Sequence, residues 1–143
     1  MGRIIAIDFG QKRTGIAVTD PLQMIANGLI TIHSKDVIDF LKKYLTSEDV
    51  DCIVVGEPRT LQNKASDASR FIEPFVKNLR KQFPEIPVKR MDERFTSSIA
   101  FQSMIDSGMK KKKRQDKSIV DTISATLILQ SYMEFMSNSN NKR

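Results

Sequence analysis

The sequence has very few residues that form covalent crosslinks or bind soft metals. Its 143 residues include one cysteine, one histidine and no tryptophan. A single cysteine excludes an internal disulfide and any metal site built from several thiolates. Cys52 lies in the apolar run Cys-Ile-Val-Val, so we expect a buried, unreactive thiol. His33 stands at the end of a predicted strand, where a surface position is favoured over a catalytic one.

Long apolar runs are also absent. A membrane-spanning helix needs about 20 consecutive apolar residues, and no run approaches that length. A secretory signal peptide is not indicated, because Arg3 is followed by only four apolar residues before Asp8. We therefore expect a cytoplasmic protein.

Positive charge exceeds negative charge in an otherwise ordinary globular composition. The chain is 40% hydrophobic and 28% charged, and its net charge is +6. This balance favours a polyanionic partner, most simply nucleic acid. The length fits one domain. We place that domain at residues 1–136, and we expect the Asn-rich tail at 137–143 to be disordered.

Apolar periodicity predicts an α/β domain that begins with an antiparallel meander. The first three strands are expected at residues 3–7, 16–20 and 26–33, joined by short connections. An apolar stripe from Val37 to Leu45 then predicts a helix, with Ser34 or Asp36 as its cap.

Two further strands follow helices and are expected to run parallel to the first strand. They lie at residues 51–56 and 86–91, and the second contains a proline near its start, which favours a sheet edge. The helix between them, at 65–83, contains Pro74, which indicates a kink or a late start. Helices at 99–108 and 117–136 complete the chain.

The first strand leads into a carboxylate and then a basic turn. Asp8 ends the strand, Gly10 and Gly15 permit a tight turn and close approach of a phosphate, and the turn carries two basic residues, Lys12 and Arg13. A carboxylate beside basic residues suits a metal ion and a phosphodiester. The alternative is that Asp8 only ends a strand in an ordinary turn.

Further carboxylates follow the last strand and occupy the final helix. Asp92 and Glu93 directly follow the strand at 86–91. Asp121 shares a helical face with Ala125 and Ile128. A carboxylate on an apolar stripe is costly unless it is paired or binds a metal. Together with Asp8, these oxygen donors suit Mg²⁺ or Mn²⁺. Two such ions about 4 Å apart activate water and stabilise a leaving oxygen. The alternative for Asp121 is an ion pair with a Lys or Arg.

Four motifs in order resemble the YqgF (RuvX) family. They are Ala-Ile-Asp-Phe-Gly from Ala6 with Lys-Arg-Thr-Gly from Lys12, Val-Gly-x-Pro from Val55, Asp-Glu-Arg from Asp92 followed by Thr-Ser, and Val-Asp from Val120 with Ser-Ala from Ser124. The resemblance covers residues 3 to about 133. It implies an RNase H-like fold, with a five-stranded mixed sheet (three antiparallel leading strands and two parallel strands) flanked by helices.

The resemblance also implies a site. Asp8, the Asp92–Glu93 pair and Asp121 occupy the family's acidic positions, and we favour Glu93 over Asp92 as the metal ligand. Glu57 departs from the family, which usually has an apolar residue there; it is either a fourth ligand or, as we favour, an exposed loop residue. Phosphate contacts are expected from the basic residues Lys12, Arg13, Arg94, Lys110, Lys111, Lys112, Lys113 and Arg114. The alternative for the run that starts at Lys110 is a solvated loop.

The leading functional hypothesis is a metal-dependent endonuclease of structured nucleic acid. Members of the family are described as pre-16S rRNA nucleases, so the resemblance implies maturation of the 5′ end of pre-16S rRNA, by a monomer or a homodimer. Two alternatives stay open: a Holliday junction resolvase acting on branched DNA, and a non-catalytic nucleic-acid-binding module. An actin-like sugar kinase or ATPase is disfavoured, because it needs two such domains and a second Gly-rich loop.

Overall fold

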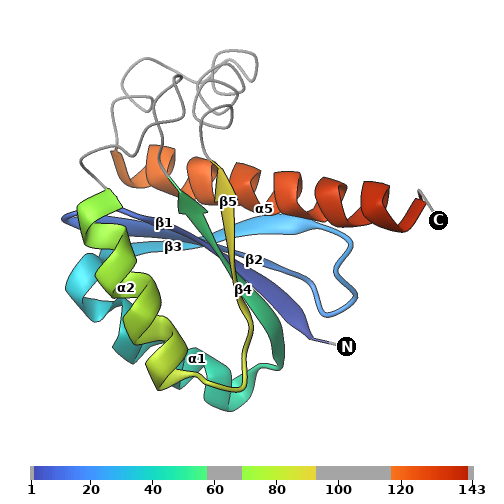
Figure 1. Ribbon diagram of the computed structural model, residues 1–143. Coiled ribbons are helices and arrows are strands. Elements are labelled where there is room, and N and C mark those ends of the chain that lie inside the picture. Colours follow the sequence, from blue (N-terminus) through green and yellow to red (C-terminus); the bar gives the residue numbers. More distant parts are fainter. Residues whose placement is uncertain (1, 58–68, 93–116, 142–143) are drawn as a thin grey trace.

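The computed structural model describes residues 2–57, 69–92 and 117–141, except for the side chains of residues 57, 69–71, 92, 117–121 and 137–141. Figure 1 shows a sheet with helices on both faces. In chain order the elements are β1 (Arg3–Phe9), β2 (Arg13–Thr19), β3 (Ala26–His33), the 3-10 helix η1 (Ser34–Asp36), α1 (Val37–Ser47), β4 (Val50–Glu57), α2 (Ser69–Gln82), β5 (Val88–Asp92) and α5 (Lys117–Asn141).

The strands form one five-stranded mixed sheet in the order β3-β2-β1-β4-β5. The hairpin partners β1–β2 and β2–β3 are antiparallel, whereas β1–β4 and β4–β5 are parallel. Parallel pairing requires a crossover, and α1 and α2 provide the helices for the two crossovers. The predicted α/β class, the antiparallel meander and the edge position of the last strand are confirmed.

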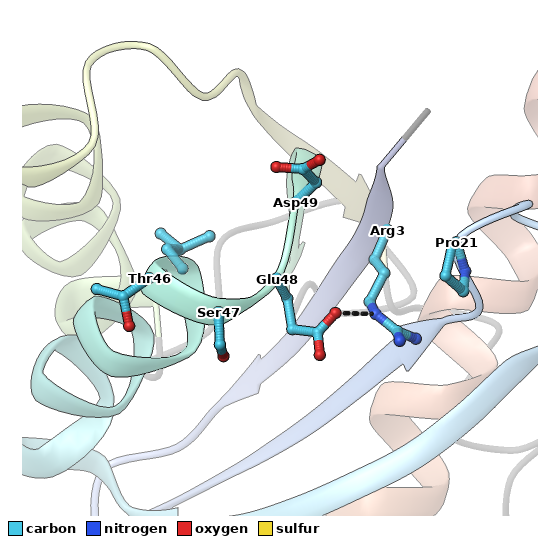
Figure 2. A pocket seen from close by; sticks show the side chains of 7 residues that line it. Arg3, Pro21, Thr46, Ser47, Glu48 and Asp49 are labelled. Carbon is cyan, nitrogen blue, oxygen red and sulfur yellow. Dashed lines mark hydrogen bonds and ion pairs between the residues drawn. The ribbon is translucent and has the colours of Figure 1, made fainter.

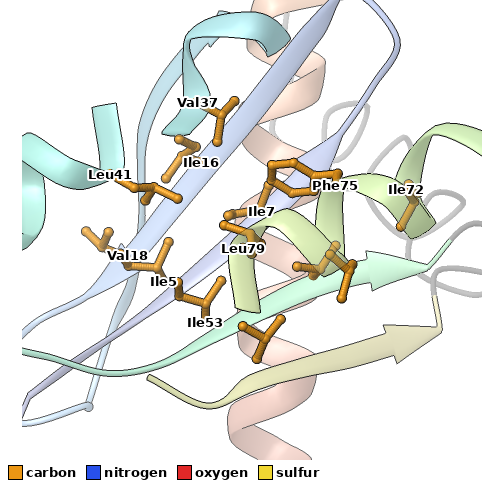
Figure 3. Packing of buried hydrophobic residues seen from close by; sticks show 13 residues of the cluster. Ile5, Ile7, Ile16, Val18, Val37, Leu41, Ile53, Ile72, Phe75 and Leu79 are labelled. Atoms are coloured by element: carbon orange, nitrogen blue, oxygen red, sulfur yellow. The ribbon is translucent and has the colours of Figure 1, made fainter. Parts of the chain in front are cut away.

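The central strands β1 and β4 are apolar because both of their faces are covered. Successive side chains of a strand point to opposite faces, so Ile5 and Ile7 of β1 lie on the face that α1 and α2 cover. Figure 3 shows these side chains packing with Leu41 of α1 and with Phe75 and Leu79 of α2. Each fully buried side chain of this size stabilises the fold by about 1.5–3 kcal/mol.

The opposite face is covered by α5 alone among the described helices (Figure 1). Ile4 and Ala6 of β1 point to this face and pack with Ala125 and Ile128 of the helix. Ala6 and Ala125 are fully buried, and their small size lets the helix approach the sheet closely. The apolar stripe predicted for the last helix is therefore the stripe that it buries.

The end of the last helix differs from expectation. We predicted that the last helix ends at residue 136 and that 137–143 is disordered, but α5 continues through Asn141. No proline or glycine interrupts this stretch, so its weak helix formers extend the helix. Pro74 lies inside α2 (Ser69–Gln82). The predicted helix at 99–108 lies outside the described residues. No helix in the described part of the chain is long and apolar enough to cross a membrane.

Candidate functional site

Three parallel strands end at one edge of the sheet, and acidic positions are found there. Asp8 is the penultimate residue of β1, β4 ends at Glu57, and β5 ends at Asp92. The register pairs Glu57 with Asp92 and Ile7 with Val55. The carboxyl ends of parallel strands are where ligand sites collect in open α/β sheets. The backbone therefore brings these positions to the edge expected from the sequence.

The side chain of Asp8 points to the α5 face of the sheet. Asp8 alternates with Ile7 and shares its face with Ala6 and Ile4, which pack against α5. Asp8 is half-buried and follows a fully buried segment of β1. This orientation directs the carboxylate toward the helix that carries Asp121.

Helix α5 runs antiparallel to β1, so its first turns lie near the end of β1 that carries Asp8. At this end, Thr122 forms a hydrogen bond of 2.6 Å with Thr31 of β3. At the other end, the Tyr132 hydroxyl lies 4.0 Å from the sulfur of Cys52, which pairs with Ile4 at the start of β1. Figure 1 shows the amino-terminal end of α5 in orange.

The sheet register places Thr31 in the same transverse row as Asp8. Asp8 pairs with Gly15 of β2, and Gly15 pairs with Thr31 of β3. Neighbouring strands lie about 4.8 Å apart, so Thr31 is about 10 Å across the sheet from Asp8. Gly15 contributes no side chain between them. Thr122 contacts this row through Thr31. Position 121 directly precedes Thr122, so the backbone of α5 at position 121 lies near the row that contains Asp8.

Several predicted site residues are not among those whose side chains are described. The side chains of Glu57, Asp92 and Asp121 lie outside the description, as do Glu93 and Arg94 in full. The same holds for the basic run Lys110, Lys111, Lys112, Lys113 and Arg114. Within the described residues no group of three or more His, Cys, Asp or Glu side chains is placed to hold a metal ion.

The predicted basic turn between β1 and β2 is present. The Gly10 amide donates to the carbonyl of Arg13 at 3.0 Å, which closes the turn, and Lys12 and Arg13 are exposed. A Cβ atom on Gly10 would lie 2.5 Å from the Arg13 carbonyl oxygen, so this tight closure requires glycine. The turn therefore presents positive charge at the edge where β1 ends.

Sequence reasoning missed the role of Ser34. We expected Ser34 or Asp36 to cap the following helix; Asp36 is the N-cap of α1, although its side chain makes no cap hydrogen bond. Ser34 instead donates from its hydroxyl to the carbonyl of Gly10 at 2.6 Å. The serine contacts a turn that lies more than 20 residues earlier in the chain, and no local pattern signals such a contact.

A hollow of about 320 Å³ lies at the opposite edge of the sheet, near the start of β1. Figure 2 shows that Arg3 points toward Glu48 across it, with a 3.0 Å ion pair between them. The hydrogen bond that Arg3 donates to the Glu48 carboxylate raises the pKa of Arg3. Pro21, Asp49 and the last turn of α1 complete the lining. None of the predicted site residues contributes to this hollow.

Two solved structures of proteins that act on or bind Holliday junctions have a similar fold. The chain superimposes on Thermus thermophilus RuvC in complex with a Holliday junction substrate with a TM-score of 0.57, at 13% identity, over 93% of this chain and 96% of the other. Its match to the fowlpox virus Holliday junction resolvase has a TM-score of 0.53 at 16% identity, over 94% and 99% of the two chains. The predicted RNase H-like fold, with a five-stranded mixed sheet, is therefore confirmed.

Sequence comparison defines the family more narrowly. Residues 2–135 match the model of the family described as "RuvX: Holliday junction resolvase", and the chain belongs to this family. It is 57% identical over 134 residues to a Phocaeicola vulgatus protein named "Putative pre-16S rRNA nuclease", covering 94% of this chain and 96% of that one. A Bacteroides thetaiotaomicron protein of the same name is 53% identical over 134 residues, with 94% and 97% coverage. The predicted family membership is confirmed.

Proposed function

We propose that this protein is a metal-dependent endonuclease that matures the 5′ end of pre-16S rRNA. The observation that carries the proposal is the placement of Asp8. Its carboxylate faces α5 at the edge where the parallel strands end, and the register brings position 121 of α5 over the same row of the sheet. The names of the most similar relatives supply the substrate.

Asp8, Glu93 and Asp121 are the proposed metal ligands. Carboxylate oxygens are the donors that Mg²⁺ and Mn²⁺ prefer, so these residue types fit such an ion. We favour Glu93 over Asp92 as the metal ligand and retain Asp92 as a catalytic candidate.

When bound, the metal supplies water activation and stabilisation of the leaving oxygen of a phosphodiester. The protein contributes the position of Asp8 at the end of a rigid central strand. Lys12 and Arg13 hold the backbone of the substrate through its phosphates, independently of sequence. The remaining proposed phosphate contacts are Arg94, Lys110, Lys111, Lys112, Lys113 and Arg114.

The domain boundaries and cellular setting are part of the same proposal. Residues 1–136 would form one nuclease domain, because both cores are built on a single sheet. The protein would act in the cytoplasm, as a monomer or a homodimer.

Cleavage of a 5′-extended 16S rRNA precursor fragment tests this function. With Mg²⁺ or Mn²⁺ present, we expect the wild-type protein to cut the fragment, and Asp8→Asn and Asp121→Asn to lower the rate by about 100-fold or more. Asp39→Asn is the control, because Asp39 is exposed on α1. Equal rates for Asp8→Asn and the wild type would refute the mechanism.

A four-way DNA junction, assayed beside the RNA, tests the alternative substrate. The family description and the resolvase neighbours favour it as the second candidate. Faster cleavage of the junction than of the RNA, by a dimer in solution, would assign the protein as a resolvase. Binding of either substrate without cleavage by any metal-loaded sample would instead indicate a non-catalytic binding module.

A further inference from the structure

Ser34 connects two segments that are distant in sequence. Its hydroxyl donates to the carbonyl of Gly10 at 2.6 Å, and its backbone amide donates to the carbonyl of Lys12 at 3.0 Å. The Thr14 and Ser34 hydroxyl oxygens are 2.9 Å apart. A hydroxyl has one proton, and that of Ser34 is directed to Gly10, so Thr14 is the donor in this contact. One serine thus fixes both sides of the β1–β2 turn.

The partners of Ser34 are themselves well fixed. Thr14 is fully buried, and Gly10 is bonded to Arg13 across the turn. Ser34 begins η1 directly after β3, and the register pairs His33 of β3 with Arg13 of β2. The backbone of the turn is therefore held from its own hairpin and from the β3–η1 junction.

We call the contacts of Ser34 with Gly10, Lys12 and Thr14 the clamp. Positively charged side chains surround it. Lys12 and Arg13 are exposed in the β1–β2 turn, and Lys35, which directly follows Ser34, is exposed in η1. The exposed His33 also belongs to this surface. Asp36 lies one residue beyond Lys35, so negative charge begins where η1 ends. Clustered Lys and Arg side chains bind phosphate groups through charge, and a rigid backbone lowers the entropy that binding costs.

We propose that the β1–β2 turn and the β3–η1 junction form one preassembled surface for a nucleic-acid backbone, in which Ser34 is a positioning residue and Lys35 contacts an additional phosphate. This proposal rests on the proposed function, because it extends the substrate path from the Asp8 edge along η1. Ser34 touches no substrate; it holds the backbone from which Lys12 and Arg13 extend.

Binding measurements on an Asp8→Asn background, which blocks turnover, test both residues. Ser34→Ala is expected to weaken binding of the 16S precursor fragment by about tenfold, since preorganisation and not charge is lost. The slope of the logarithm of the RNA association constant against the logarithm of salt concentration should then stay unchanged, and Ser34→Thr should restore affinity. Lys35→Ala should instead reduce the magnitude of this slope by about one.

Two further readouts separate positioning from loss of stability. In the active protein, Ser34→Ala should raise KM for the RNA and leave kcat within about twofold. Hydrogen exchange at the Gly10 and Ser34 amides should accelerate, because both amides are bonded within the clamp. Thr46→Ala is the matched control, since Thr46 also donates to a backbone carbonyl, that of Lys43, at 2.6 Å but lies at the far end of α1.

Unchanged affinity in Ser34→Ala together with an unchanged salt slope in Lys35→Ala would overturn the inference, even if the wild-type protein cuts RNA as proposed. Absence of both binding and cleavage in the wild-type protein would overturn the proposed function together with it. If Ser34→Ala does not fold, Ser34→Thr and Lys35→Ala decide the question, because the first keeps the hydroxyl and the second changes only an exposed side chain.

Discussion

Tyr132 and Cys52 form the polar part of the core beneath α5. Each is only 8% exposed, and the Tyr132 hydroxyl lies 4.0 Å from the Cys52 sulfur. Burial raises the pKa of Tyr132 to about 12 and also raises the pKa of the Cys52 thiol. The expectation of a buried thiol is confirmed. Its raised pKa keeps it protonated near neutral pH, which makes it a weak nucleophile.

The raised pKa of Tyr132 predicts a loss of stability in alkali. Between pH 10 and about 12 the folded state keeps the phenol proton while the unfolded state releases it. The unfolded state then binds fewer protons, so the free energy of unfolding falls as pH rises through this window. Urea unfolding at pH 8, 10 and 11 should show a smaller decline for Tyr132→Phe than for the wild type.

Tyr44→Phe is the control for that measurement, since it removes the other of the two tyrosines. Burial also raises the pKa of Tyr44, so this variant separates the two contributions. A decline in Tyr132→Phe as steep as that of the wild type would show that the Tyr132 phenol does not control alkaline stability.

At the scale of elements, the Thr31–Thr122 hydrogen bond attaches the start of α5 to the edge strand β3. It joins residues 91 positions apart at 2.6 Å. Gly28 of β3 allows this approach, because a Cβ atom at position 28 would lie 2.3 Å from Cγ2 of Thr122. The contact fixes the turn of α5 that precedes Ala125, and therefore the backbone position of Asp121.

Breaking this contact should affect stability modestly and cleavage more strongly. Thr122→Val is expected to lower the free energy of unfolding by about 1 kcal/mol, the usual net value of such a hydrogen bond. It should also raise the Mn²⁺ concentration needed for half-maximal cleavage, since Asp121 is adjacent. Thr122→Ser keeps the hydroxyl and should behave as the wild type.

A double-mutant cycle of Thr122→Val with Thr31→Val tests whether the hydrogen bond between the two threonines causes these effects. If the hydrogen bond is responsible, the two substitutions together should cost less than the sum of their separate effects. Strictly additive effects on both stability and metal requirement would show that the two threonines act independently.

Apolar periodicity along the chain predicted the strands and helices, because it depends only on residues that are close in sequence. The strand expected at 26–33 matches β3 (Ala26–His33) at both ends, and the helix from Val37 is α1. Contacts between distant segments could not be predicted in this way. A serine before a helix indicates a cap, yet Ser34 bonds to Gly10, and nothing in the chain near Thr31 points to Thr122.

For the whole molecule, the candidate site depends on bringing the two ends of the chain together. Asp8 belongs to the first strand and Asp121 to the last helix, and the antiparallel course of α5 places both positions toward one edge of the sheet. The acidic pattern and the family motifs predicted this arrangement from the sequence. The preference for Mg²⁺ or Mn²⁺ is inferred only from the carboxylate oxygens that the proposed ligands offer.

The most direct test of this account is Mn²⁺ binding measured by titration calorimetry on the full chain without nucleic acid. The account predicts that the wild-type protein and Asp39→Asn bind Mn²⁺ alike, whereas Asp8→Asn and Asp121→Asn each weaken binding by about tenfold or more. Binding of Mn²⁺ by both of these variants with wild-type affinity would show that Asp8 and Asp121 do not share a metal site, and it would contradict the account.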